Sequence, residues 1–112
     1  MTDAVRFKTG ELKHLILSSE EYHKYDMCRR KLNEMPELKK KVNEFRNANM
    51  QIRLSGSSQD AGRTQQIGME YSEVLTNSVA REFLNAELGL CKLIQNINAM
   101  LISDLELELD FL

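Results

Sequence analysis

The longest hydrophobic pattern in this chain lies between residues 77 and 105. Its apolar positions recur at alternating steps of four and three residues, which is typical of a helix with one continuous buried face. Flanking apolar residues widen that face beyond the roughly 100° of an ordinary surface helix, so we expect covering neighbours on more than one side. At about 1.5 Å per residue, this helix is about 40 Å long. The pattern consists of Val79, Phe83, Ala86, Leu90, Leu93, Ile97 and Met100, flanked by Leu84, Leu88, Cys91, Ile94 and Leu101.

Weaker apolar stripes with the same period predict four further helices ahead of this one. Ser18 followed three residues later by Glu21 is a helix start signal. Pro36 marks a boundary, because proline suits a first helical turn and the residue before it avoids the helical conformation. We therefore expect a helical hairpin around Pro36, and a cap for the last helix at Asn77 or Ser78. The predicted helices span residues 3–17, 20–34, 36–54, 60–76 and 78–104.

These elements predict an all-α fold, a bundle of about five helices around the long C-terminal helix. A chain of 112 residues has the length of a single domain. Residues 104–112 alternate acidic and apolar side chains, so a strand and a helix both fit their pattern. Carboxylates at a helix C-terminus oppose its dipole, and we expect a loosely ordered acidic tail, with partner docking as the alternative. The apolar helix surface exceeds what four short neighbours cover, which favours a homodimer.

Other segments carry little that points to a cofactor or a membrane. Residues 55–62 are rich in serine and glycine but lack the spacing of phosphate-binding glycine motifs, so we interpret them as a linker. Cys28 and Cys91 lie inside helical patterns without a C-x-x-C motif, and we interpret them as reduced core thiols. A zinc or iron–sulfur site needs about four ligands, so no metal or cofactor is predicted. No run approaches the roughly 20 apolar residues of a membrane span, and we expect a cytoplasmic protein.

Charge is distributed unevenly along the chain. Residues 24–53 carry nine Lys and Arg against four Asp and Glu, whereas residues 54–112 carry three against nine. A turn at Pro36 brings six cations together, and three interpretations fit them. They form a solvated face, a docking site for an acidic partner surface or a phosphate backbone, or a surface masked by the acidic tail of a neighbouring subunit. These candidate binding residues are Arg29, Arg30, Lys31, Lys39, Lys40 and Lys41.

Candidate oligomer contacts lie on the first predicted helix. Phe7 and His14 fall opposite its apolar face, where both an exposed, frayed end and a second subunit fit the pattern. Catalytic groups are not indicated. His14 and His23 have no Asp, Ser or Cys partner at a recognisable spacing, and the adjacent carboxylates Glu20 and Glu21 act as a helix cap. We therefore predict no catalytic residues and no enzyme activity.

Several motifs follow one another in a characteristic order: Ser19-Glu20-Glu21-Tyr22 and Tyr25, then Pro36-Glu37-Leu38 and Phe45, then Asn77, Val79, Phe83, Ala86-Glu87, Leu90, Leu93-Ile94 and Ile97-Asn98. Their order and distances resemble the YlbF/YmcA family of small helical bacterial proteins, from about Ala4 to Ser103. The resemblance implies an all-α bundle that forms a dimer or higher oligomer and acts as a regulator. Members of that family influence competence, biofilm formation and sporulation, in a complex that adjusts messenger-RNA processing by a membrane-associated endoribonuclease.

Two departures from the family pattern bear on what carries over. Ser78 stands where the family often has proline, and these 112 residues hold no cysteine-rich extension after the bundle. An iron–sulfur role known in some members therefore does not carry over.

The resulting hypothesis is a non-enzymatic regulatory adaptor that assembles with itself and binds other regulatory or RNA-processing proteins. The alternative is an RNA-binding module that uses the basic hairpin around Pro36. RNA-binding modules usually combine positive charge with exposed aromatic side chains, whereas Tyr22, Tyr25 and Phe45 are expected in the core. We therefore expect contact with RNA to be indirect.

Overall fold

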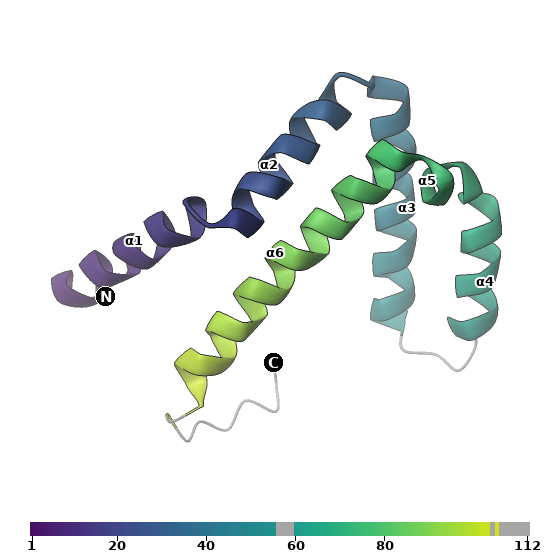
Figure 1. The fold of residues 1–112 in the computed structure, drawn as a ribbon. Helices are drawn as coiled ribbons and strands as arrows, with labels where there is room; N and C mark the ends of the chain where they lie inside the picture. Colours follow the sequence, from purple (N-terminus) through teal and green to yellow (C-terminus); the bar gives the residue numbers. More distant parts are fainter. Residues whose placement is uncertain (56–59, 104, 106–112) are drawn as a thin grey trace. The chain divides into compact units, whose positions relative to one another are not determined.

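The computed structural model describes residues 1–55, 60–103 and 105, and every regular element in this part of the chain is an α-helix (Figure 1). The predicted all-α class is confirmed there. Residues 56–59 of the predicted linker, and all of the predicted acidic tail except Leu105, lie outside the described residues. The linker prediction is wrong at its two ends, because residue 55 still belongs to α3 and residues 60–62 already belong to α4. The helices are α1 (Asp3–Leu17), α2 (Glu20–Asn33), α3 (Pro36–Ser55), α4 (Asp60–Glu70), α5 (Ser72–Thr76) and α6 (Ser78–Ile102).

Three helix starts form where the local chemistry of the sequence predicts them. The Tyr22 amide donates to the Ser19 hydroxyl oxygen at 3.1 Å, so Ser19 caps α2 one residue after Ser18, the serine that the spacing to Glu21 indicated. Pro36 is the first residue of α3, where its missing amide proton leaves no hydrogen bond unmade. The Ala80 amide donates to Asn77 Oδ1 at 3.1 Å and caps α6. These contacts satisfy amides that the first turn of a helix otherwise leaves without a partner.

The sequence pattern predicted one helix over residues 60–76, and this is wrong at Tyr71. Tyr71 has φ −107° and ψ 31° and separates α4 from α5. Its amide still donates to the Ile67 carbonyl at 2.9 Å, while its own carbonyl accepts the Val74 amide at 3.0 Å in a tighter turn. The break places both Ile67 and Val74 in the core. Periodicity did not reveal it, because the spacing of these three residues also fits an unbroken helix.

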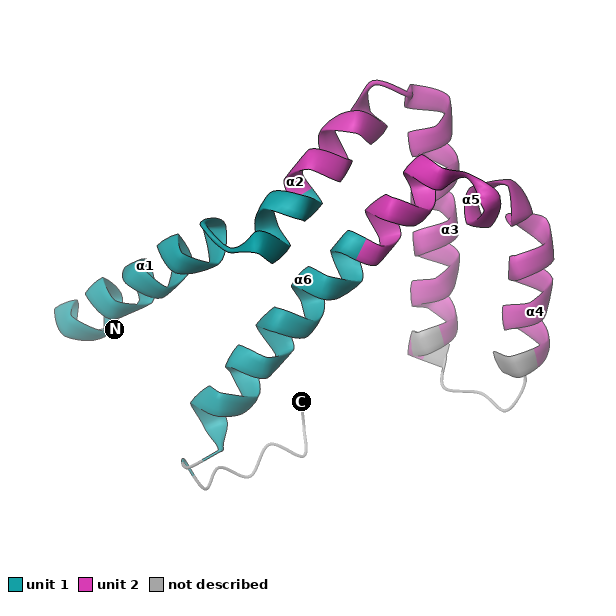
Figure 2. Ribbon diagram, viewed as in Figure 1, with its two compact units in different colours: residues 1–25, 86–112 teal, residues 26–85 magenta. Residues whose placement is uncertain are grey.

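The chain divides into two compact units, residues 26–85 and residues 1–25 with 86–112 (Figure 2). The first, unit 2, holds the rest of α2, all of α3, α4 and α5, and the start of α6. Within it α3 contacts both α4 and α5. The Phe45 and Tyr71 rings meet edge to face with centroids 5.8 Å apart, and the Arg46 guanidinium lies 5.6 Å from the Phe83 ring centroid. Its buried apolar residues are Leu32, Val42, Ile52, Ile67, Val74, Ala80 and Phe83.

Unit 1 holds α1, the start of α2 and the remainder of α6, and it is covered much less. No residue of α1 is buried. Along α6, Phe83 and Ala86 are buried, Leu93 is half-buried, and Met100 is 78 % exposed. The predicted apolar seam therefore has the expected spacing but not the expected burial, because its cover runs out toward the C-terminal end of the helix. The organisation as a single domain stays a prediction.

The two cysteines differ in their surroundings. Both are free thiols, but only Cys28 is half-buried, whereas Cys91 is exposed on α6. The interpretation of Cys91 as a core thiol is therefore wrong. It falls on the flank of the apolar seam, in the same stretch of α6 where the cover is lost.

Candidate partner-binding surfaces

The turn between α2 and α3 is tight and is stabilised by backbone hydrogen bonds. The Met35 amide donates to the Leu32 carbonyl at 2.9 Å, and the Lys39 amide donates to the Met35 carbonyl at 2.8 Å. Pro36 fixes the first residue of α3 between these two bonds. The turn thereby holds the Met35 side chain, 40 % exposed, at the edge of the first turn of α3.

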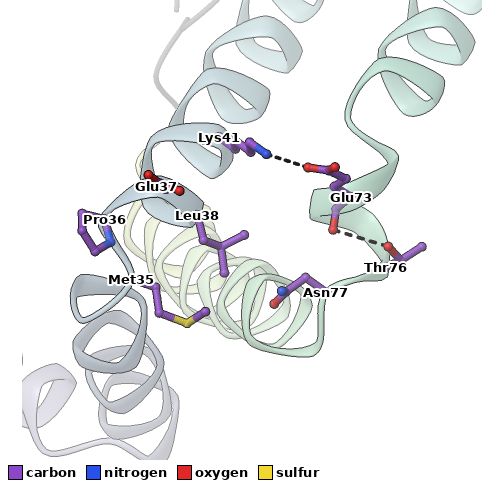
Figure 3. A pocket seen from close by; sticks show the side chains of 8 residues that line it. All are labelled: Met35, Pro36, Glu37, Leu38, Lys41, Glu73, Thr76 and Asn77. Atoms are coloured by element: carbon purple, nitrogen blue, oxygen red, sulfur yellow. Dashed lines mark hydrogen bonds and ion pairs between the residues drawn. The ribbon is translucent and has the colours of Figure 1, made fainter.

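An open pocket of about 770 Å³ lies between this turn and the junction of α5 with α6 (Figure 3). Its apolar part is formed by Met35, Pro36 and Leu38. Across from them, Lys41 and Glu73 form one wall of the pocket, and Thr76 and Asn77 lie on the α5 to α6 side. All of these residues belong to unit 2.

Most polar side chains of this pocket already have hydrogen-bond partners within the chain. Lys41 Nζ donates to Glu73 Oε2 at 2.6 Å. Thr76 Oγ1 donates to the Ser72 carbonyl at 2.9 Å, and Asn77 Oδ1 accepts the Ala80 amide. Glu37 also lines the pocket, and no hydrogen bond or ion pair of its carboxylate occurs among the described residues. Apart from this carboxylate, the pocket offers mainly apolar contact surface, which suits apolar side chains of a partner.

The ion pair shifts the acid–base equilibria of both its members. The hydrogen bond to Glu73 and its charge raise the pKa of Lys41 above its ordinary value of 10.5. The same contact lowers the pKa of Glu73 below its ordinary value of 4.5. Partial burial, together with the nearby carboxylates Glu70 and Glu44, raises the pKa of the Tyr71 hydroxyl above its ordinary value. Lys41 and Glu73 are thus charged together through the whole neutral pH range.

The structure separates the six predicted cations into two groups of three. Arg29 and Arg30 both pair with Asp26, Arg30 at 3.1 Å, and Lys41 pairs with Glu73. In the described part of the chain, the other three side chains are exposed and form no ion pair. These are Lys31, Lys39 and Lys40.

Lys39 and Lys40 line a shallow depression of about 450 Å³ that shares Pro36 with the larger pocket. The other residues of this depression lie further along the same face of α3. They are Asn43, Glu44 and Asn47. The segment from residue 36 to residue 47 carries four cations against two carboxylates. An apolar pocket and a cationic stretch of helix therefore adjoin each other at Pro36.

A second candidate surface is the exposed apolar part of unit 1. Phe7 is 65 % exposed, with the Lys8 ammonium 5.9 Å from its ring centroid, and His14 is also exposed. Their role in an oligomer stays a prediction. We call the exposed apolar residues of α6 in unit 1 the unit 1 apolar surface; they are Leu88, Ile94, Met100, Leu101 and Ile102, while α1 separately exposes Val5, Phe7, Leu15 and Leu17.

Reasoning from the sequence missed two kinds of feature at these surfaces. It did not pair Lys41 with Glu73, because Glu73 belongs to no apolar stripe and the two are 32 residues apart. It also did not place Thr76 or Asn77 beside Met35, since this requires the α5 to α6 junction to meet the α2 to α3 turn. The one available signal was that both breaks, at Pro36 and at Asn77, were recognised as helix boundaries.

The described residues show neither a metal-binding cluster nor a membrane-spanning helix. Nowhere among them do three His, Cys, Asp or Glu side chains gather in an arrangement for a metal ion. None of their helices combines the length and apolar character that crossing a membrane requires.

Comparison with known protein families gives a match over most of the chain. A family model described as "Control of competence regulator ComK, YlbF/YmcA" matches residues 5–106. This range agrees with the resemblance found in the order of the sequence motifs. No curated protein and no solved structure matches the chain.

Proposed function

Because the chain belongs to the YlbF/YmcA family, a regulatory family linked to control of the competence regulator ComK, we propose that it is a non-enzymatic regulatory adaptor. Its task is to bind other proteins and to form a homodimer, in the cytoplasm. The observation that carries this proposal is the loss of cover along α6, where the apolar seam continues while burial falls from Phe83 to Met100. Monomeric proteins rarely leave such a continuous apolar surface to water.

The proposed division of labour follows from the two surfaces. The unit 1 apolar surface has the character of a subunit interface, since such interfaces are apolar at their centre and poor in charge. The turn around Pro36 combines an apolar pocket with exposed lysines and suits a partner that brings acidic and apolar groups together. By resemblance to the family, the partners are other regulatory or RNA-processing proteins.

The experiment that tests the adaptor function is affinity capture of the full chain from its native cells, with and without nuclease. The test variant is Lys31→Gln/Lys39→Gln/Lys40→Gln, which removes the three cations that form no described ion pair. The matched control is Lys24→Gln/Arg63→Gln/Arg81→Gln, which removes the same charge from other exposed positions.

We expect the test variant to lose specific bound proteins that the control retains, with the same oligomeric state in both. RNA binding is also measured with purified protein and purified RNA. If the wild type and the control bind RNA there and the test variant alone does not, the result would favour the RNA-binding alternative instead. Equal recovery of every partner by the wild type and both variants would leave the lysines as a solvated face.

A further inference from the structure

The pocket at the α2 to α3 turn combines an apolar lining with an acidic one. Met35, Pro36 and Leu38 supply the apolar part, and the carboxylates of Glu37 and Glu73 line the pocket as well (Figure 3). Its volume of about 770 Å³ lies within the usual range of binding clefts. Because the pocket is open, side chains of another protein can enter it.

One of these two carboxylates is already neutralised, and the other is not. Lys41 Nζ is held on Glu73 Oε2 at 2.6 Å. Glu37 forms no hydrogen bond or ion pair with any residue that the structure describes, although it lies within electrostatic reach of Lys41, as Glu44 does. The pocket lining thus carries two negative charges against one positive charge.

The position of Glu37 explains why an unpaired carboxylate is tolerated there. It lies in the first turn of α3, where the helix dipole favours negative charge. This interaction stabilises α3 but supplies no side-chain donor to the carboxylate. Since Glu37 is exposed, its carboxylate stays available to a cation from another molecule.

The exposed lysines of α3 do not compensate this charge. Lys39 and Lys40 line the separate depression rather than the pocket. Glu44 is the one carboxylate that lines the depression with them. The two sides of α3 therefore carry excess charge of opposite sign, so that an acidic segment suits the depression and a basic segment suits the pocket.

An occupant of the pocket has to satisfy both parts of its lining. Apolar side chains gain by leaving water at Met35 and Leu38. An exposed ion pair adds little affinity by itself, but it gives orientation and discriminates between partners. Arginine and lysine combine an apolar stem with a charged head, so their stems extend the apolar contact while their heads reach a carboxylate.

We propose that the pocket formed by Met35, Pro36 and Leu38 binds a partner segment in which an apolar side chain stands next to an arginine or lysine, whose charged head pairs with Glu37. The inference rests on the adaptor function proposed above and names the chemistry that the pocket recognises. Acidic groups of the same partner fit the depression, which shares Pro36 with the pocket. The order of the two charges along the partner then fixes its orientation across Pro36.

The test measures how the full chain binds three short, blocked and fluorescently labelled peptides, by fluorescence anisotropy. The first peptide alternates leucine with arginine. The second has uncharged citrulline in place of each arginine, and the third has glutamate there. The salt concentration is about 0.15 M, at which charges further apart than about 8 Å are largely screened.

Each test variant has a matched control. Glu37→Gln removes the unpaired carboxylate, and Glu82→Gln removes an exposed carboxylate of α6 that does not line the pocket. Met35→Ser removes an apolar side chain of the pocket, and Met69→Ser removes one that is 74 % exposed on α4. Circular dichroism verifies that each variant keeps its helix content.

We expect the wild type and Glu82→Gln to bind the arginine peptide about three- to tenfold more tightly than the citrulline peptide, as expected for one charge pair at a partly shielded site. Glu37→Gln should lose this preference, and Glu37→Lys should reverse it toward the glutamate peptide. Met35→Ser should weaken binding of the arginine and citrulline peptides by the same factor, whereas Met69→Ser should leave both unchanged.

Two results would overturn the proposal. The first is that the wild type shows no preference for the arginine peptide, or does not bind it at millimolar concentration. The second is an equal loss of preference in Glu37→Gln and Glu82→Gln, which would assign the preference to the net charge of the protein.

Affinity capture from native cells tests the adaptor function separately. Captured partners together with no arginine preference would refute the pocket proposal and leave the adaptor function intact. An arginine preference without any captured partner would refute the adaptor function and leave the pocket as a peptide-binding site.

Discussion

Lys41 on α3 and Glu73 on α5 are joined by an ion pair of 2.6 Å, although they stand 32 residues apart in the sequence. This contact ties the first turns of α3 to α5, on one wall of the pocket at the α2 to α3 turn. Both side chains remain exposed to water, so the ion pair contributes little to the free energy of unfolding and acts mainly to position α5 against α3.

The pH dependence of stability should carry the signature of this pair. Glu73 has a lowered pKa in the folded chain, so its contribution is present above pH 4.5 and is lost as the pH falls through the folded value. Lys41 has a raised pKa, so its contribution is complete below pH 10.5 and is lost at higher pH. Glu73→Gln should therefore be less stable than the wild type at pH 7, with a difference that disappears in strong acid.

Urea unfolding at pH 7 and at pH 3 measures this difference, with Glu82→Gln as the control for loss of an exposed carboxylate. A difference between wild type and Glu73→Gln that persists unchanged at pH 3 would contradict the assignment to the ion pair.

The cost of truncating the α6 seam should depend on its position. Phe83 is 3 % exposed within unit 2, and Phe83→Ala should lower the free energy of unfolding by about 3–5 kcal/mol at any protein concentration. Leu93 is half-buried, so Leu93→Ala should reach the about 2–5 kcal/mol of a fully buried leucine only where a second subunit covers it. Denaturation at low and at high protein concentration distinguishes a loss that arises within one chain, as for Phe83→Ala, from a loss that requires the second subunit, as for Leu93→Ala. A concentration-independent loss below about 1 kcal/mol for Leu93→Ala would mean that this part of the seam faces water.

The oligomeric state should respond to charge placed on the unit 1 apolar surface. Ile94 and Leu101 are seven residues apart on α6 and are 41 % and 58 % exposed. Ile94→Glu/Leu101→Glu should convert a dimer to a monomer in sedimentation without loss of helix content, because buried carboxylates without partners are costly at an interface. Met50→Glu/Met69→Glu adds the same charge to exposed positions of unit 2 and should leave the dimer unchanged. Equal sedimentation of all three proteins would exclude this surface as the interface.

Asn77 should stabilise the start of α6 through its side chain. Its Oδ1 accepts the Ala80 amide at 3.1 Å, and Asn77→Ala should cost about 0.5–2 kcal/mol in thermal or urea unfolding. Asn77→Ser keeps an oxygen in reach of the same amide and should recover most of that loss. Equal stability of the alanine and serine variants would show that the cap contributes nothing.

The features that were predictable from the sequence are those fixed by neighbouring residues. Ser19 and Asn77 cap amides within one helical turn, and Pro36 suits a first turn because it lacks an amide proton. These helix starts can therefore be recognised in a short window of sequence, to within one residue at α2. The break at Tyr71 lies beyond such reasoning, because the apolar spacing across it is that of a continuous helix. The Tyr71 ring meets the Phe45 ring edge to face, a tertiary contact that a short window of sequence does not reveal.

The candidate surfaces were only half predictable for the same reason. The sequence identifies cations around Pro36, but Arg30 and Lys41 differ in their partners, and only the folded chain brings Glu73 to Lys41. Likewise, a periodic pattern marks the apolar side of α6 without saying what covers it. Leu90 and Leu93 belong to the same stripe as Phe83, yet their cover depends on elements elsewhere in the fold.

Nearly all buried side chains of the described residues lie in the contiguous stretch from residue 26 to residue 85. This distribution affects the order in which the chain folds and where it opens locally. A core assembled from contiguous helices closes short loops, so unit 2 can form while α1 is still unstructured. Amide protons of α3 and of the first turns of α6 should then exchange with deuterium only through global opening. Those of α1, which buries no residue, should exchange through fraying within the native ensemble.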